Sequence, residues 1–140
     1  MLILALFFLF HGLSLDIYWI QLLYYMIASL ILLSGLGWIF ASFVIFIQDL
    51  KNLIPILIQF GFWVTPIFWS ISKVPLKYQI YVKANPFVFL IQGYRDSMIN
   101  KIWFWERGLE NLYFWSLSLL LFFLGYFVFR RLRSHFVDVL

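Results

Sequence analysis

Charged positions divide this chain into long apolar runs. Residues 17–48, 52–72 and 111–129 contain no Asp, Glu, Lys or Arg. Each run is close to the roughly 20 residues that a helix needs to cross a bilayer, and one charge at the bilayer centre costs about 2.5–3.5 kcal/mol. The pattern therefore predicts three full transmembrane helices, with Asp49 and Lys51 in a short loop between the first two.

The first run is too long for one straight crossing, because a helix over all of 17–48 would extend about 48 Å. Either the helix breaks at residues 34–37, or the glycines there allow a neighbouring helix to pack closely. Gly37 and Ala41 form a small-xxx-small pair of the kind found where membrane helices meet, and we favour close packing. Residues 1–15 are apolar but short and lack a basic start, which favours the end of a truncated membrane helix over a signal peptide.

The run 52–72 contains two prolines. Pro55 suits the first turn of a helix, whereas Pro66 lies well inside and should kink or end it. A membrane helix tolerates such a break where protein or water satisfies the freed backbone groups. The stretch around Thr65 and Pro66 is therefore predicted to face protein or a wet cavity rather than lipid.

The segment between the last two runs predicts an amphipathic helix. Asn85 is a good N-cap and Pro86 suits the first turn. One face is apolar, and the other carries polar residues. The polar face is either solvated or forms a gate or head-group contact. The apolar positions are Phe87, Leu90, Ile91, Tyr94, Met98 and Ile102, and the polar ones are Gln92, Arg95, Asp96 and Asn100.

Composition agrees with a membrane protein. The 140 residues are 65% hydrophobic, 24% aromatic and 11% charged, whereas soluble domains carry about 25% charged residues. We expect an all-α membrane protein with a single transmembrane domain over residues 1–140. The net charge of +4 comes from cations in loops and a tail, so nucleic acid is not an expected partner.

The sequence offers no recognisable catalytic centre. No glycine is followed by lysine, as a phosphate-binding loop requires, there are no cysteines, and the two histidines lie far apart. No carboxylate falls inside an apolar run, so a proton relay has no candidates there. We therefore expect no enzyme activity, no metal and no cofactor on this chain, and any transport must draw its energy from a partner.

Charge counting leaves the orientation open. The loop at 48–52 and the tail share one side and carry four cations, whereas the opposite side carries six. The tail is more concentrated, and such a cluster usually marks the cytoplasmic end. The first group is Lys51, Arg130, Arg131 and Arg133, and the second is Lys73, Lys77, Lys83, Arg95, Lys101 and Arg107.

The order of several short motifs from about residue 30 onward resembles the C-terminal half of the membrane subunit of ABC type-2 exporters. The resemblance is to the permeases that export polysaccharide and polyol-phosphate chains such as capsule, O-antigen (the glycan of lipopolysaccharide) or teichoic acid. The matching stretches are Gly35-Leu36-Gly37-Trp38, Phe46-Ile47-Gln48-Asp49-Leu50, Leu53-Ile54-Pro55, Gln59-Phe60, Thr65-Pro66-Ile67-Phe68, Val74-Pro75, Ala84-Asn85-Pro86-Phe87, Gly93-Tyr94-Arg95, Phe129-Arg130-Arg131-Leu132-Arg133 and Phe136-Val137-Asp138-Val139-Leu140.

The resemblance implies a six-span homodimer in the bacterial inner membrane, driven by separate ATPase subunits that hold the ATP and Mg²⁺. It implies an external gate at residues 85–101 and a cytoplasmic anchor at Arg130, Arg131 and Arg133. It also places Gln48, Asp49 and Lys51 in a cytoplasmic loop near the ATPase. The chain differs in two respects. Gln48 stands where many relatives have Arg, and the chain begins inside what would be the third span.

A glycan channel needs many weak contacts, which aromatic rings provide by stacking on the C–H faces of sugars. The candidate lining residues are Phe62, Trp63, Phe68 and Trp69, which flank Pro66. Alternatively, these rings face lipid or pack between helices. Drug or lipid efflux, an inert membrane scaffold and a membrane-embedded transferase remain as alternative functions of the chain.

Overall fold

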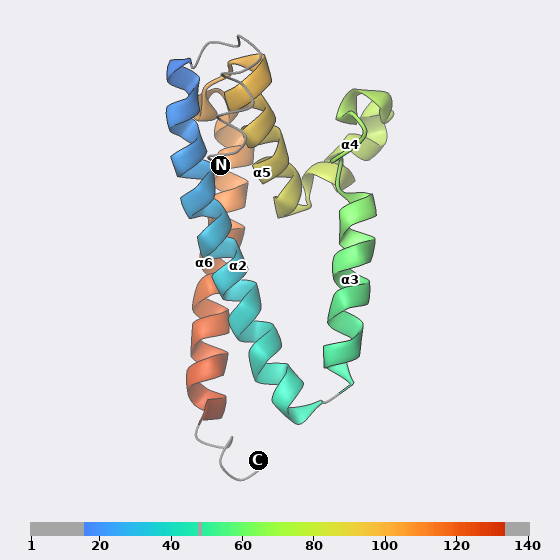
Figure 1. Ribbon diagram of the computed structural model, residues 1–140, viewed down its shortest axis with the longest axis vertical. Helices are drawn as coiled ribbons and strands as arrows, with labels where there is room; N and C mark the ends of the chain where they lie inside the picture. Colours follow the sequence, from blue (N-terminus) through green and yellow to red (C-terminus); the bar gives the residue numbers. More distant parts are fainter. Residues whose placement is uncertain (1–15, 48, 134–140) are drawn as a thin grey trace, which may run out of the picture.

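Two long helices form the axis of the molecule. The computed structural model describes residues 16–47 and 49–133, and every regular element in them is helical. Helix α2 (Gln21–Phe46) follows the 3₁₀ turn η1 (Ile17–Ile20), and α6 (Gly108–Leu132) follows the turn η4 (Phe104–Arg107). Both helices run in the same direction along the long axis (Figure 1). With their turns they have 30 and 29 residues and are long and apolar enough to cross a membrane.

The third apolar run does not form a full-length helix. Helix α3 (Leu50–Val64) runs back along α2 but has only 15 residues, about 22 Å at 1.5 Å per residue. Thr65 is extended, with ψ of 135°, because proline disfavours the helical conformation in the residue before it. Pro66 therefore follows the end of the helix and does not kink it. The structure does not confirm a third full span, and the predicted truncated first helix lies outside the described residues.

Helices α2 and α6 meet through glycine. A Cβ atom on Gly35 would lie 2.7 Å from the backbone N of Phe122, and one on Gly125 would lie 2.4 Å from the carbonyl O of Gly35. Any side chain at either position would hold the two backbones apart, so the close contact between α2 and α6 requires glycine at both positions. Trp38 packs beside this contact, with its ring centroid 4.9 Å from that of Phe122.

Of the two alternatives for residues 34–37, the structure supports close packing. Helix α2 continues without a break through these residues. The predicted small-residue pair was nevertheless wrong in detail, because a Cβ atom on Gly37 would meet nothing within 4 Å. Gly35 is the glycine that faces α6.

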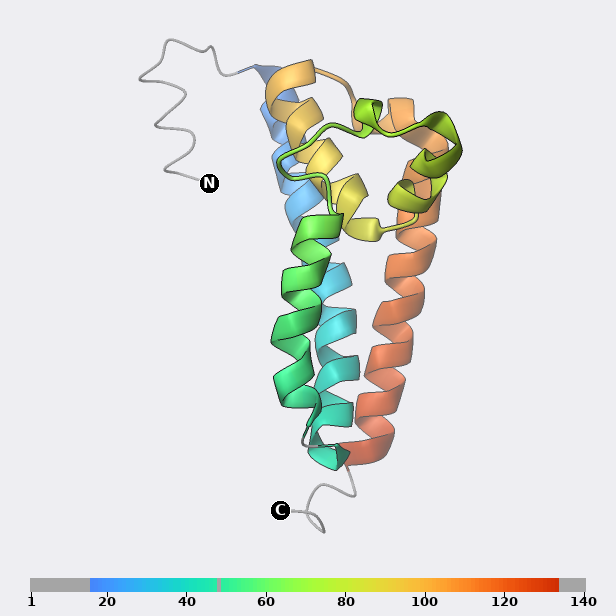
Figure 2. The same ribbon diagram turned by 90° about the vertical axis from the view of Figure 1, so that its right-hand side faces the viewer.

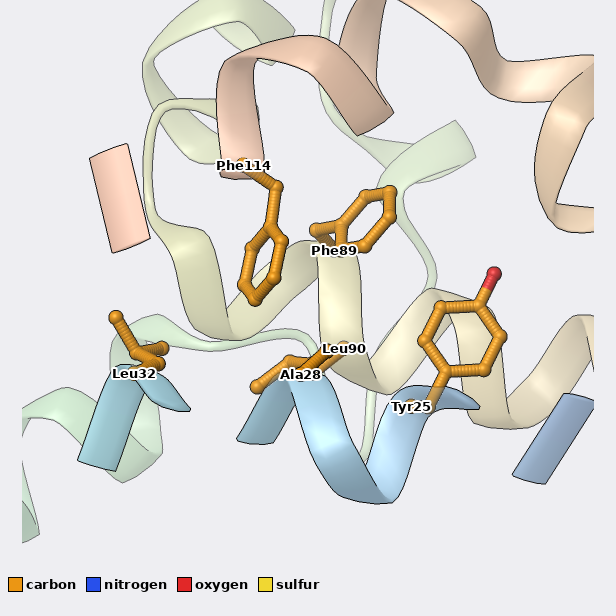
Figure 3. Close-up of a cluster of buried hydrophobic side chains, with 6 residues drawn as sticks. All are labelled: Tyr25, Ala28, Leu32, Phe89, Leu90 and Phe114. Carbon is orange, nitrogen blue, oxygen red and sulfur yellow. The ribbon is translucent and has the colours of Figure 1, made fainter. Parts of the chain in front are cut away.

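Helix α5 (Pro86–Arg95) packs against the upper half of this pair. The ring of Phe89 stacks on Phe114 of α6 at 4.6 Å and lies 5.7 Å from Tyr25 of α2 (Figure 3). Gly93 allows the close approach, since a Cβ atom there would overlap the Tyr25 ring. The helix continues as one π-helical stretch, η3 (Asp96–Asn100), which ends at Lys101 in the left-handed conformation with φ of 55°.

Charged residues in the described part of the chain gather at the two ends of the molecule. The turn between α2 and α3 and the end of α6 lie at one end. The opposite end holds η3, η4, the turn η2 (Ile71–Lys73) and α4 (Leu76–Lys83), as Figure 2 shows. Because the two long helices cross the middle without a charged residue, the distribution fits a bilayer around that middle.

Replacement of the contact glycines tests the helix pair. Gly35→Ala and Gly125→Ala should each lower the free energy of unfolding in detergent by about 1–3 kcal/mol, because the added methyl forces the backbones apart. Gly37→Ala is the matched control and should be neutral or stabilising, since alanine favours helix by about 1 kcal/mol. Equal effects at Gly35 and Gly37 in denaturant titrations would contradict the close contact.

Candidate functional site

The turn that follows α3 is buried and held by hydrogen bonds. Thr65 is 4% exposed and Pro66 is fully buried. The Thr65 hydroxyl donates to the carbonyl of Gly61 at 2.6 Å and accepts from the Asn85 side-chain amide at 3.2 Å. The side-chain oxygen of Asn85 in turn accepts from the backbone N of Phe87 at 3.0 Å. The prediction that Asn85 caps a helix is confirmed. Of the two surroundings predicted for Thr65 and Pro66, protein or a wet cavity, the structure shows burial in protein.

Arg95 holds the same turn from the other end of α5. Its guanidinium donates to the carbonyl of Ile67 at 2.5 Å and to that of Trp69 at 3.5 Å. These carbonyls lie outside any regular helix, so the arginine supplies donors that the backbone there lacks. Residues 65–69 are thus fixed to both ends of α5, through Asn85 and Arg95.

Asp96 is buried beside the first turn of the last span. It is 1% exposed, and its Oδ2 lies 2.7 Å from Nη2 of Arg107. Its Oδ1 accepts from the side chain of Asn100 at 2.7 Å. A buried carboxylate requires such partners because desolvation of an unpaired charge is costly. The solvated-face alternative is therefore wrong for Asp96, which connects η3 to η4.

Arg107 connects several elements at this end. Besides Asp96, its guanidinium contacts the Gln92 side-chain oxygen at 3.3 Å and a Glu110 oxygen at 3.4 Å. Glu110 also pairs with Lys83 of α4 at 2.7 Å. A network of charged and polar side chains therefore links α4, α5, η3, η4 and α6. In the sequence, the i, i+3 spacing of Arg107 and Glu110 is a weak signal for this network.

An exposed ion pair lies nearby. Lys101 contacts the carboxylate of Asp16, and this hydrogen bond, with the attraction of the negative charge, raises the pKa of Lys101. The pair joins the chain before η1 to the end of η3. Tyr94, the remaining residue of the predicted gate helix, is half-buried and packs 5.9 Å from the ring of Tyr25.

The four candidate aromatic residues do not converge on one cavity. Phe62 lines an apolar groove of about 570 Å³ between α2 and α3, which Phe87 and Ile91 of α5 close at one end. Trp63 and Phe68 are 67% and 78% exposed, and both rings contact Phe62 edge-on. Trp69 is half-buried, and its ring N–H donates to the carbonyl of Trp63 at 3.5 Å.

The candidate cytoplasmic residues lie at the end of the molecule where α3 begins and α6 ends, opposite η3 and η4 (Figure 1). Asp49 and Lys51 are exposed at the start of α3, and Gln48 lies outside the described residues. Arg130 and Arg131 are in the last turn of α6, and Arg133 follows it. In residues 16–47 and 49–133, no three metal-binding side chains come together.

Comparisons with known proteins agree with the motif order. No family model matches the chain. It is 27% identical over 114 residues to the O-antigen export system permease protein RfbA of Klebsiella pneumoniae, and 25% identical over 114 residues to a second protein with the same name and source. Each alignment covers 81% of this chain and 43% of the relative. The chain thus spans less than half the length of these relatives, and its resemblance to ABC type-2 export permeases is confirmed.

The buried ion pair predicts that substitutions at Asp96 and Arg107 have strongly coupled effects on the free energy of unfolding. Asp96→Ala should lower the free energy of unfolding by about 3 kcal/mol, because it leaves Arg107 without its main partner. The double variant with Arg107→Ala should lose less than the sum of the single variants, by at least about 1 kcal/mol.

The exposed pair of Asp16 and Lys101 is the matched control for this double-mutant cycle. Solvent screens its charges, so its coupling should be much the smaller of the two. Denaturant titration in detergent measures both cycles. Additive losses at Asp96 and Arg107 would refute the buried pair.

Proposed function

We propose that this chain is part of the permease subunit of an ATP-driven exporter that carries polysaccharide or lipid-linked glycan across the bacterial inner membrane. The observation that carries the proposal is the similarity to two O-antigen export permeases over 81% of the chain. Two long apolar helices with charges at their ends support a location in the bilayer.

We further propose that a separate ATPase subunit supplies the energy. Within residues 16–47 and 49–133 the structure describes no cluster of metal-binding side chains, and the sequence has no phosphate-binding loop of the usual kind. The subunit works as a homodimer, and the ATPase binds at the end that carries Asp49, Lys51 and the arginines after α6. That end is cytoplasmic, in keeping with the general preference of Lys and Arg clusters for the cytoplasmic side.

At the opposite, external end, α5 and η3 form the gate. The hydrogen bonds of Asn85 and Arg95 to residues 65–69 support this assignment, because they connect the break after α3 to both ends of α5. Displacement of α3 relative to α5 would open or close the path between them, and the aromatic residues Phe62, Trp63, Phe68 and Trp69 would contact the passing glycan.

Co-purification tests the transport function. A tagged chain isolated from its host in mild detergent should carry an ATP-hydrolysing partner, and the double variant Asp49→Ala/Lys51→Ala should recover several-fold less of it. Lys77→Ala, an exposed lysine on α4 at the other end, is the control and should recover the normal amount. A chain that is folded in the membrane yet brings down no ATP-hydrolysing protein would refute the proposal.

The aromatic lining has its own test. In cells that depend on the exporter, Trp63→Ala and Trp69→Ala should reduce surface polysaccharide several-fold without lowering the amount of permease in the membrane, because stacking contacts to the glycan are lost. Phe127→Ala removes a ring that is 74% exposed on α6 and should leave export unchanged. Normal surface polysaccharide in both tryptophan variants would exclude the lining role.

A further inference from the structure

A second hollow lies at the end of the molecule that carries α4 and η4. It has a volume of about 410 Å³ and shares no lining residue with the apolar groove between α2 and α3. This volume is within the roughly 300–1,000 Å³ of small-molecule sites. Segments from η2 to α6 form the wall, and its polar members are Ser72, Gln79, Lys83, Gln92, Arg107 and Glu110.

The charges around this cavity cancel. Lys83 pairs with Glu110 at 2.7 Å, and Arg107 pairs with Asp96, which is buried behind it, at 2.7 Å. Glu110 also lies 3.4 Å from Arg107. Two cations therefore face two carboxylates. An anion entering the cavity would lie close to Glu110 and would have to compete with it for both cations, so the site disfavours phosphate and other anions.

Two glutamine amides add unused hydrogen-bonding groups. The Gln79 amide N donates to the carbonyls of Ile71 and Val74, at 3.4 and 2.9 Å. The Gln92 amide O accepts from Arg107 at 3.3 Å. These partners fix the orientation of both amides, because a carbonyl only accepts and a guanidinium only donates. The oxygen of Gln79 and the nitrogen of Gln92 have no partner among the described residues, which leaves one acceptor and one donor in the lining.

Such a wall matches a ligand rich in hydroxyl groups. Each hydroxyl both donates and accepts, so a neutral sugar satisfies the amides without disturbing the ion pairs. Val88 and Ile71 complete the lining with apolar surface, which suits the C–H faces of a sugar ring. Partly buried polar groups need such a partner or water.

We propose that this cavity binds a neutral sugar unit of the exported glycan. The proposal rests on the export function and deepens it, since it favours an uncharged glycan over a phosphate-bearing polymer as the substrate. The affinity of one unit is weak, with a Kd on the order of 1 mM, so that a long chain can leave the site again.

Binding to the purified chain tests this proposal without the ATPase. The chain is placed in lipid nanodiscs free of sugar-based detergent, and saturation-transfer NMR measures binding of maltose, glycerol 3-phosphate and inorganic phosphate. Maltose should bind with a millimolar Kd, and the two phosphates should bind at least tenfold more weakly. Preferential binding of either phosphate, or no binding of maltose, would overturn the proposal.

Substitutions of the glutamines in the cavity wall test whether maltose binds in this cavity. Gln79→Leu/Gln92→Leu should weaken maltose binding at least tenfold, because both free hydrogen-bonding groups are lost. Gln92→Glu keeps the acceptor for Arg107 but removes the free donor, and it should weaken binding several-fold even if the double variant fails to fold. Gln59→Leu makes the same substitution at an exposed position on α3 and should bind normally. Wild-type affinity in a folded Gln92→Glu protein would place the sugar elsewhere.

The maltose-binding test and the co-purification test distinguish failure of the sugar-site proposal from failure of the transport proposal. If the chain recovers an ATPase but does not bind maltose, only the cavity assignment fails. If it binds maltose through Gln92 but recovers no ATPase, the sugar site stands and the export function fails.

Discussion

The close contact between the backbones of α2 and α6 is the interaction on which the other contacts depend. In lipid, apolar side chains gain little by leaving their surroundings, so packing and interhelical hydrogen bonds must hold helices together. Gly35 and Gly125 provide the packing. Higher up, the Tyr24 hydroxyl donates to Asn111 at 2.6 Å, which joins the same two helices by a polar contact. Helix α5 then rests on both α2 and α6, so its position follows from theirs.

Helix α5 is fixed more firmly to α6 than to α3. Toward α6 it has stacked rings and, through Asp96, a buried ion pair. Toward α3 it has the hydrogen bonds that Asn85 and Arg95 make with the turn at residues 65–69, and Phe87 and Ile91 line the groove that it shares with α3. Helix α3 itself buries no residue. Helices α2, α5 and α6 therefore form a tightly packed unit, to which α3 is more loosely attached. Displacement of α3 would first break the hydrogen bonds that the turn at residues 65–69 makes with Asn85 and Arg95.

Local chemistry made several features predictable. The charge-free runs located both long helices, Asn85 and Pro86 located the start of α5, and Pro66 located the end of α3. The partners of the polar residues were not predictable, because they depend on which distant segments meet. Arg95 is next to Asp96 in sequence, yet it bonds to residues 67 and 69, and Asp96 pairs with Arg107. The choice of Gly35 over Gly37 likewise depends on which side of α2 meets α6.

The short length of α3 has a consequence for the surrounding lipid. At about 22 Å it falls short of a hydrocarbon layer of about 30 Å by about 8 Å, whereas its long neighbours exceed that thickness. Such hydrophobic mismatch is relieved when the bilayer thins locally or when polar ends sink toward its centre. The bilayer beside α3 would therefore be locally thinner, with head groups and water nearer to the midplane than elsewhere around the protein.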